Sequence, residues 1–205
     1  LADPPRAGRQ GGSATVTVRR SAATAVIAAL LAAFPAAAQA SPVSTSREVL
    51  TEHEMPAGSS GYTVRTATAR VPSATVPDTA CDRAGRRADV ALAGSTGTEA
   101  TARRAGDTLR VEVSDRPGVA VARDVITSCN ADPGVVPASE VAPPPDLARM
   151  APSVTRTWDG RLLQSVVDVR GMSIAVSVTG SQKPADSATF WQLLRTQITK
   201  VEKAR

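Results

Sequence analysis

The segment "SVTRTWDGRLLQSVVDVRGMSIAVSVTG", residues 153–180, holds three β-strand patterns in a row and decides the predicted fold. Asp159-Gly160 is a strong hairpin signal between the first two strands, and Gly171 separates the second from the third. In the last two strands, every second residue points to the same face of the sheet. The residues of this face are Leu163, Ser165, Val167 and Val169, followed by Met172, Ile174, Val176 and Val178.

A helix pattern follows the three strands. Residues 181–205, "SQKPADSATFWQLLRTQITKVEKAR", place apolar side chains at helical spacing, and Asp186 or Ser187 is expected to cap the first turn. The predicted stripe consists of Phe190, Leu194, Gln197, Ile198 and Val201, and Leu193 lies beside it. An antiparallel meander covered by a C-terminal amphipathic helix predicts an α+β fold class.

The preceding part of the chain is less regular. A short helix starting near Thr45 would direct Val49 and Leu50 to the core, and residues 62–71 alternate like a strand. Residues 99–104 and 109–114 predict a hairpin, whereas 88–94 predicts a strand after a loop with one helical turn capped by Asp78. Residues 116–129 fit either a strand or a helix, and shared helical spacing favours the helix.

A proline-rich crossing divides the predicted domain. Residues 130–152 contain six prolines, at positions 133, 137, 143, 144, 145 and 152. This density is incompatible with a long helix or a central strand. The segment is therefore expected to cross the surface, partly as polyproline II, and a Pro-rich ligand for a partner module is the alternative reading.

Residues 18–40 have the three parts of a secretory signal peptide. Arg19 and Arg20 form the basic region, an apolar run follows up to Phe34, and small residues precede the expected cleavage between Ala40 and Ser41. The apolar run is too short for a typical membrane span, although an uncleaved anchor is the alternative. The arginine pair leaves Sec and twin-arginine export open. Residues 1–17 resemble an upstream extension that is not translated, with a valine start.

The expected mature domain is residues 41–205, a single secreted domain of the extracellular space or cell wall. The whole chain carries a net charge of +5, but these residues keep 20 of the 24 basic and 18 of the 19 acidic side chains. Their net charge of +2 and their few aromatic side chains argue against nucleic-acid binding. No stable membrane span is expected after cleavage.

Two cysteines, Cys81 and Cys129, are present. In an exported chain an even, small number of cysteines predicts a disulfide. Two free thiols are the alternative. A zinc site needs three or four ligands, and the chain has a single histidine, His53, so no metal site and no cofactor are expected.

Motifs for catalysis are not evident. The chain lacks a G-x-S-x-G elbow and a phosphate-binding glycine loop. A carboxylate pair for hydrolysis depends on distance rather than spacing, and Asp159 with Asp168 is the nearest candidate. Asp159 is nevertheless expected in the turn and Asp168 on the solvent face. The prediction is a non-enzymatic protein, with a hydrolase of unrecognised carboxylate site as a lesser alternative.

Aromatic side chains suggest a ligand site. Trp158, Phe190, Trp191 and Leu194 are the candidates, because an aromatic beside the helix stripe can line a groove between helix and sheet. The alternative is that these residues only complete the core.

Three short motifs suggest a relationship: "TAC" at Cys81, "ITSC" at Cys129 and "FWQLLRTQITKVEKA" at residues 190–204. With the order of predicted elements, they resemble small exported or lipid-anchored actinobacterial domains, similar to the extracellular sensor domain of mycobacterial serine/threonine kinases. The sequence differs in having two cysteines rather than four, no tryptophan shortly before the second, and no kinase or transmembrane segment. The resemblance implies an α+β domain with a cleft for an unknown ligand and supplies no catalytic residue.

These observations predict a secreted binding or sensor-like module of the cell envelope. Its ligand is expected to be an apolar, lipid or glycan molecule, or another envelope component. The alternative is a structural or protein-interaction domain without a small ligand. The oligomeric state is left open.

Overall fold

The computed structural model describes residues 44–71 and 79–204. The predicted upstream extension, the signal peptide and the Ala40–Ser41 cleavage site lie outside the described residues. The helices are α1 (Thr45–Glu48), the 3₁₀ helix η1 (Glu52–Glu54), α2 (Ala80–Leu92), α3 (Val119–Asn130), α4 (Pro145–Ala148) and α5 (Ser187–Lys203). The strands are β1 (Ser60–Thr68), β2 (Thr96–Arg104), β3 (Asp107–Ser114), β4 (Ala138–Glu140), β5 (Ser153–Thr157), β6 (Leu162–Val169) and β7 (Met172–Gly180).

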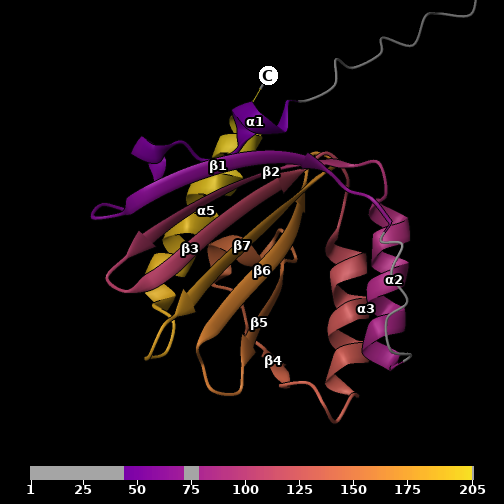
Figure 1. Ribbon diagram of the computed structural model, residues 1–205. Coiled ribbons are helices and arrows are strands. Elements are labelled where there is room, and N and C mark those ends of the chain that lie inside the picture. Colours follow the sequence, from indigo (N-terminus) through magenta and orange to yellow (C-terminus); the bar gives the residue numbers. More distant parts are fainter. Residues whose placement is uncertain (1–43, 72–78, 205) are drawn as a thin grey trace, which may run out of the picture. The chain divides into compact units, whose positions relative to one another are not determined.

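The described strands form one antiparallel sheet of seven strands in the order β1-β2-β3-β7-β6-β5-β4 (Figure 1). The β3–β7 pairing joins the N-terminal hairpin to the C-terminal meander, with Val111 opposite Val176. The sheet therefore unites two sequence segments that are separated by α3 and the proline-rich crossing. This arrangement confirms the predicted α+β class with an antiparallel meander, a C-terminal helix and one disulfide.

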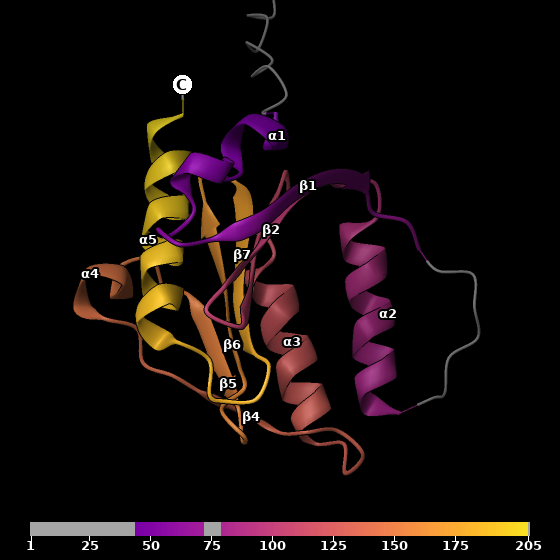
Figure 2. The same cartoon turned by 60° about the vertical axis from the view of Figure 1, so that its left-hand side comes forward.

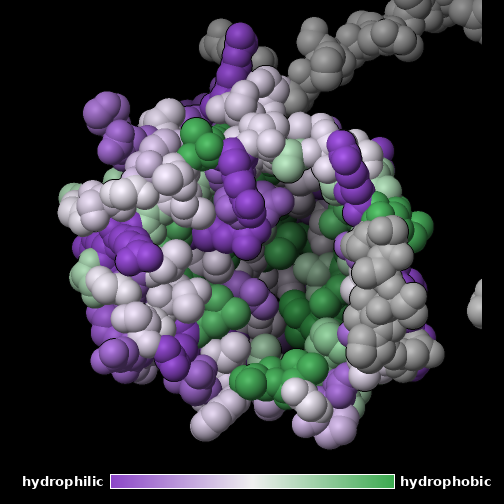
Figure 3. Space-filling view, viewed as in Figure 1, coloured by the Kyte–Doolittle hydropathy of each residue, from purple (hydrophilic) through white to green (hydrophobic). Residues whose placement is uncertain are grey.

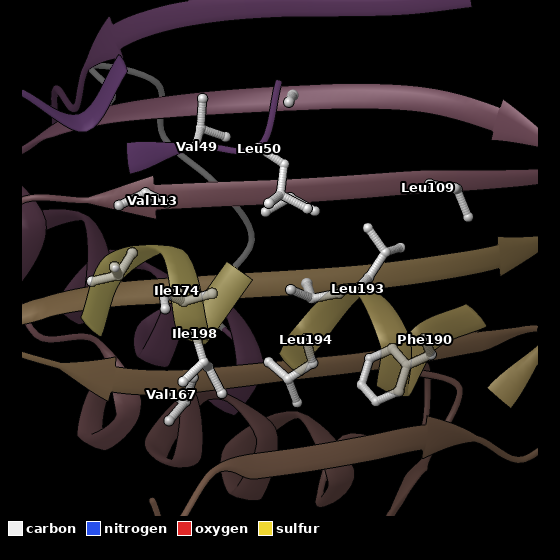
Figure 4. Close-up of a cluster of buried hydrophobic side chains, with 14 of the residues drawn as sticks. Val49, Leu50, Leu109, Val113, Val167, Ile174, Phe190, Leu193, Leu194 and Ile198 are labelled. Carbon is white, nitrogen blue, oxygen red and sulfur yellow. The ribbon is translucent and has the colours of Figure 1, made fainter. Parts of the chain in front are cut away.

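Helix α5 covers one face of the sheet, and its apolar stripe is buried (Figure 4). Asp186 caps the helix by accepting hydrogen bonds from the backbone N–H groups of Ala188 and Thr189, as predicted. The N-terminal segment joins the same layer, because Val49 and Leu50 are buried there. Gln197 is also buried, and its side chain bonds to the backbone of residues Glu48 and Leu50.

Helices α2 and α3 form an antiparallel pair on the opposite face, so the sheet lies between two helical layers (Figure 2). The Cys81–Cys129 disulfide joins the start of α2 to the end of α3, which confirms the predicted pairing. Only Ala84 is buried among the residues of α2, and none is buried in α3. The α2–α3 pair is therefore packed less deeply than α5.

The prediction for residues 80–94 was wrong. The expected loop and strand are replaced by the single helix α2, which begins at the N-cap Thr79 rather than at Asp78. Thr79 accepts from the backbone N–H of Asp82, and the Asp82 carboxylate accepts from the Thr79 N–H. This reciprocal capping and the Ala, Arg and Leu content stabilise a helix. The short "ADVAL" alternation imitated a strand.

The predicted hairpin and the favoured helix of residues 116–129 agree with the structure. Strands β2 and β3 form the expected hairpin with Ala105 and Gly106 in its turn, and residues 119–130 are helical. The proline-rich crossing contains the short strand β4 at the sheet edge and the single turn α4. Its prolines restrict regular structure to these two short elements.

Candidate ligand-binding cavity

A cavity of about 560 Å³ lies between the sheet and the α2–α3 pair. In the space-filling view the molecule is hollowed at this place, with hydrophobic residues along the side formed by the helices (Figure 3). Small side chains of three strands form part of its floor, namely Ala67 of β1, Gly97 of β2 and Ser173 and Ala175 of β7. Because these side chains are small, space stays open between the sheet and the α2–α3 pair, whereas larger side chains fill the corresponding space beneath α5.

The helical wall of the cavity is apolar. Several hydrophobic side chains of α2 and α3 line the cavity, where they remain partly accessible. The wall residues are Ala88 and Leu92 of α2, with Val121, Ala122, Val125 and Ile126 of α3. An apolar surface facing an open cavity is the arrangement that binds an apolar group of a ligand.

Four charged side chains from three neighbouring strands form the polar wall. Arg65 Nε donates to Glu99 Oε1 at 3.0 Å, and Arg110 Nη2 donates to Glu112 Oε2 at 3.0 Å. The Arg110 Nε atom also pairs with Glu99, so the charges form a continuous chain. The Glu99 side chain is only 12% exposed. Hereafter this set, Arg65–Glu99–Arg110–Glu112, is called the charged ladder.

Asp168 of β6 holds the first turn of α3. Its Oδ1 atom accepts from the backbone N–H of Gly118 at 2.7 Å and from that of Val119 at 3.2 Å. Gly118 packs so closely that a Cβ atom there would lie 3.1 Å from the Ser173 Oγ. The expectation that Asp168 faces solvent was wrong, because the carboxylate caps a helix whose own N-cap residue is glycine.

The four predicted ligand residues do not share a groove. Phe190 and Leu194 are fully buried in the core beneath α5. Trp191 is partly buried and makes an edge-to-face contact with Phe190, with ring centroids 4.8 Å apart. Trp158 is 74% exposed and lies after β5, where its backbone N–H donates to the Pro137 carbonyl. Packed side chains occupy the predicted site between α5 and the sheet, and the 560 Å³ cavity is on the other face.

The sequence did not predict the cavity because its residues come from six strands and two helices that are distant in sequence. Its one sequence signal is the second face of the meander, where Ser173 and Ala175 alternate with large apolar residues. Small and polar side chains on a strand usually indicate a solvent face. Here α3 covers that face without filling it.

The other residues considered for catalysis or metal binding lie apart from one another in the structure. Asp159 lies in the β5–β6 turn as predicted, and hydrogen bonds from the Thr157 hydroxyl and the Arg161 backbone N–H lower the pKa of its carboxyl group. His53 lies in η1 and is exposed. Both cysteines are in the disulfide. Within residues 44–71 and 79–204, no three His, Cys, Asp or Glu side chains are grouped to hold a metal ion.

Comparison of the chain with protein-family models, curated proteins and solved structures finds no match. The resemblance to actinobacterial sensor domains therefore remains a hypothesis. Among the described helices, none combines the length and apolar character that crossing a membrane requires.

Proposed function

We propose that this protein is a non-enzymatic binding module of the cell envelope, and that its ligand occupies the cavity between the sheet and the α2–α3 pair. The observation that carries the proposal is the partial exposure of apolar side chains from α3, including Val121, Val125 and Ile126, around the cavity. A volume of about 560 Å³ is within the range of small-molecule sites. The ligand therefore has an apolar part that contacts α3.

Export is part of this proposal. The predicted signal peptide lies outside the described residues, and the Cys81–Cys129 disulfide is a feature typical of exported proteins. A protein that binds an apolar molecule in the envelope would meet ligands that dissolve poorly in water. The proposal places it outside the cytoplasmic membrane, in the extracellular space or at the cell wall.

A cavity-filling substitution tests the site. Ala122→Phe would place an aromatic ring in the helical wall, whereas Ala188→Phe on the exposed first turn of α5 is the matched control. The probe is the neutral fluorescent dye N-phenyl-1-naphthylamine, titrated into the folded protein. We expect the wild type and the control to enhance its fluorescence and the Ala122→Phe variant to lose at least about tenfold in affinity. Equal binding by all three proteins would reject this cavity as the site.

A second candidate function rests on an exposed apolar patch just before strand β4 and just after strand β5. The patch consists of Val135, Val136 and Trp158, with exposed fractions of 37%, 53% and 74%. The Trp158 N–H···Pro137 carbonyl hydrogen bond at 3.2 Å holds these segments together. An exposed tryptophan beside two valines suits contact with another protein.

Site-specific photocrosslinking distinguishes this second function. A photoreactive residue at position 158 should give one discrete adduct in cells if the patch is an interface. The same residue at Val90, which is 64% exposed on α2, is the control. Similar labelling patterns from both positions would argue against a specific interface at Trp158.

A further inference from the structure

We propose that the cavity selects an uncharged amphiphile, a molecule with an apolar chain and a polar head without net charge. This inference rests on the proposed binding function and adds the chemical class of the ligand. The apolar chain contacts α3, and the head group lies against the charged ladder, which lines the same cavity.

The cross-strand register explains why the charged ladder exists. Glu99 of β2 lies directly opposite Glu112 of β3, and two carboxylates in this relation repel each other. Arg110 resolves the repulsion because it pairs with both carboxylates. Arg65, directly opposite Glu99 on β1, adds a second cation. The two arginines therefore already neutralise the two glutamates, and the ladder has no net charge.

A charged head group would disturb this balance. An anionic head would compete with Glu99 for Arg65 and Arg110, and would leave a carboxylate of 12% exposure without its partners. A cationic head would compete with the arginines for the same carboxylate. The arginine side chains are 75% and 49% exposed, so the loss arises mainly from the largely buried Glu99 carboxylate that is left without a partner. Either type of ligand would therefore lose affinity through the ladder.

An uncharged polar head avoids this loss. Hydroxyl and amide groups can donate to the carboxylates, and hydroxyl, ester and amide oxygens can accept from the guanidinium groups, without separating the ion pairs. Neutral partners also line the cavity, including Ser153, Thr155 and Gln164. Gln164 Nε2 donates to the Thr155 hydroxyl at 3.2 Å, which leaves its carbonyl oxygen to accept from a ligand. The polar wall thus offers both donors and acceptors.

Three amphiphiles with the same dodecyl chain length test the inference: glycerol monododecanoate, dodecanoate and dodecyltrimethylammonium. Each is titrated below its micelle concentration against the protein loaded with N-phenyl-1-naphthylamine. We expect the uncharged glyceride to displace the dye at a concentration at least about tenfold lower than either ion, because only the ions disturb the ladder. A charged amphiphile that displaces the dye as well as or better than the glyceride would overturn the inference.

The two proposals fail differently. If the dye binds but no dodecyl compound displaces it, the cavity binds apolar molecules and the head-group assignment is wrong. If neither the dye nor any amphiphile binds, the proposed function itself fails, and the head-group assignment falls with it.

A ladder variant provides the decisive comparison. Glu99→Gln removes one negative charge and leaves the two arginines in excess, so we expect the affinity for dodecanoate to rise about tenfold relative to the glyceride. Glu140→Gln, on the exposed strand β4, should leave the preference unchanged. Glu112→Gln is the second variant. The Glu112 side chain is 36% exposed, so its replacement should disturb folding less than Glu99→Gln does. No change in preference in either folded ladder variant would contradict a role for the charged ladder.

Discussion

Arg87 of α2 forms a bidentate ion pair with Asp124 of α3, with Nε–Oδ2 and Nη2–Oδ1 distances of 3.0 Å. This pair and the Cys81–Cys129 disulfide are two separate links between the same antiparallel helices. Helix α2 contacts chiefly α3 rather than the sheet. The position of α2 over the cavity therefore depends on its attachment to α3.

Removal of the disulfide should destabilise the domain and release α2. Closing a loop with a sequence separation of 48 corresponds to a stabilisation of about 4 kcal/mol in the chain-entropy model. We expect the Cys81→Ser/Cys129→Ser variant to unfold at lower urea concentration and to lose hydrogen-exchange protection first in residues 80–92. If α2 has the same hydrogen-exchange protection in this variant as in the wild type, the position of α2 does not depend on the disulfide.

Loss of the buried amide of Gln197 should weaken the layer beneath α5. Its Oε1 accepts from the Leu50 N–H at 3.0 Å, and its Nε2 donates to the Glu48 carbonyl at 2.6 Å. Gln197→Ala would leave a buried backbone N–H unpaired and a void, which together cost about 2–4 kcal/mol in urea unfolding. The exposed Gln192→Ala on the same helix is the control, with an expected change below about 0.5 kcal/mol.

Substitution of Asp168 should loosen the start of α3. Asp168→Ala removes the acceptor for the Gly118 and Val119 N–H groups, and we expect a loss of about 1–2 kcal/mol in unfolding free energy. Asp168→Asn keeps one acceptor oxygen and loses the charge, so its effect should be smaller. An equal loss in both variants would show that the hydrogen bonds are not the stabilising contact. Dye binding measured in parallel reports whether α3 still forms the cavity wall.

Acid should weaken the attachment of α5. The hydrogen bond from the Thr189 hydroxyl lowers the pKa of Asp186 below its usual value of 3.8, with help from two backbone N–H groups and Arg104. Because the folded pKa is lower than the unfolded one, this stabilisation is complete above about pH 4–5 and is lost as the pH falls through the folded pKa. Unfolding free energies measured from pH 5 to 2 should fall less steeply in Asp186→Asn than in the wild type, and parallel slopes would refute this assignment.

Hydrophobic periodicity and turn residues were sufficient to predict the part of the fold that contains the core. The alternation of residues 162–180 and the stripe of α5 predicted both the sheet face and the helix that covers it, because burial there is complete. Helix α2 was mispredicted because the short "ADVAL" alternation imitates a strand, although the helix buries only Ala84. The disulfide could be predicted since only one pairing exists.

The candidate site was less accessible to sequence reasoning. The aromatic residues suggested a ligand site at Phe190 and Trp191. Large aromatic side chains, however, fill space and therefore belong to the packed side of the sheet. The cavity is instead defined by small residues such as Gly97 and Ala175, whose effect depends on which helix lies above them. The charged ladder depends on the register of β1, β2 and β3, which no local pattern in the chain specifies.

The contrast between the two helical layers has an evolutionary consequence. Because α5 and the core-facing side chains of the sheet are fully packed, most exchanges there reduce stability and would be eliminated. The partly exposed residues of α2 and α3 contribute far less to stability, so they can vary while the fold persists. Descendants of a common ancestor could in this way retain one scaffold and acquire different ligands, which predicts slow divergence along α5 and rapid divergence around the cavity.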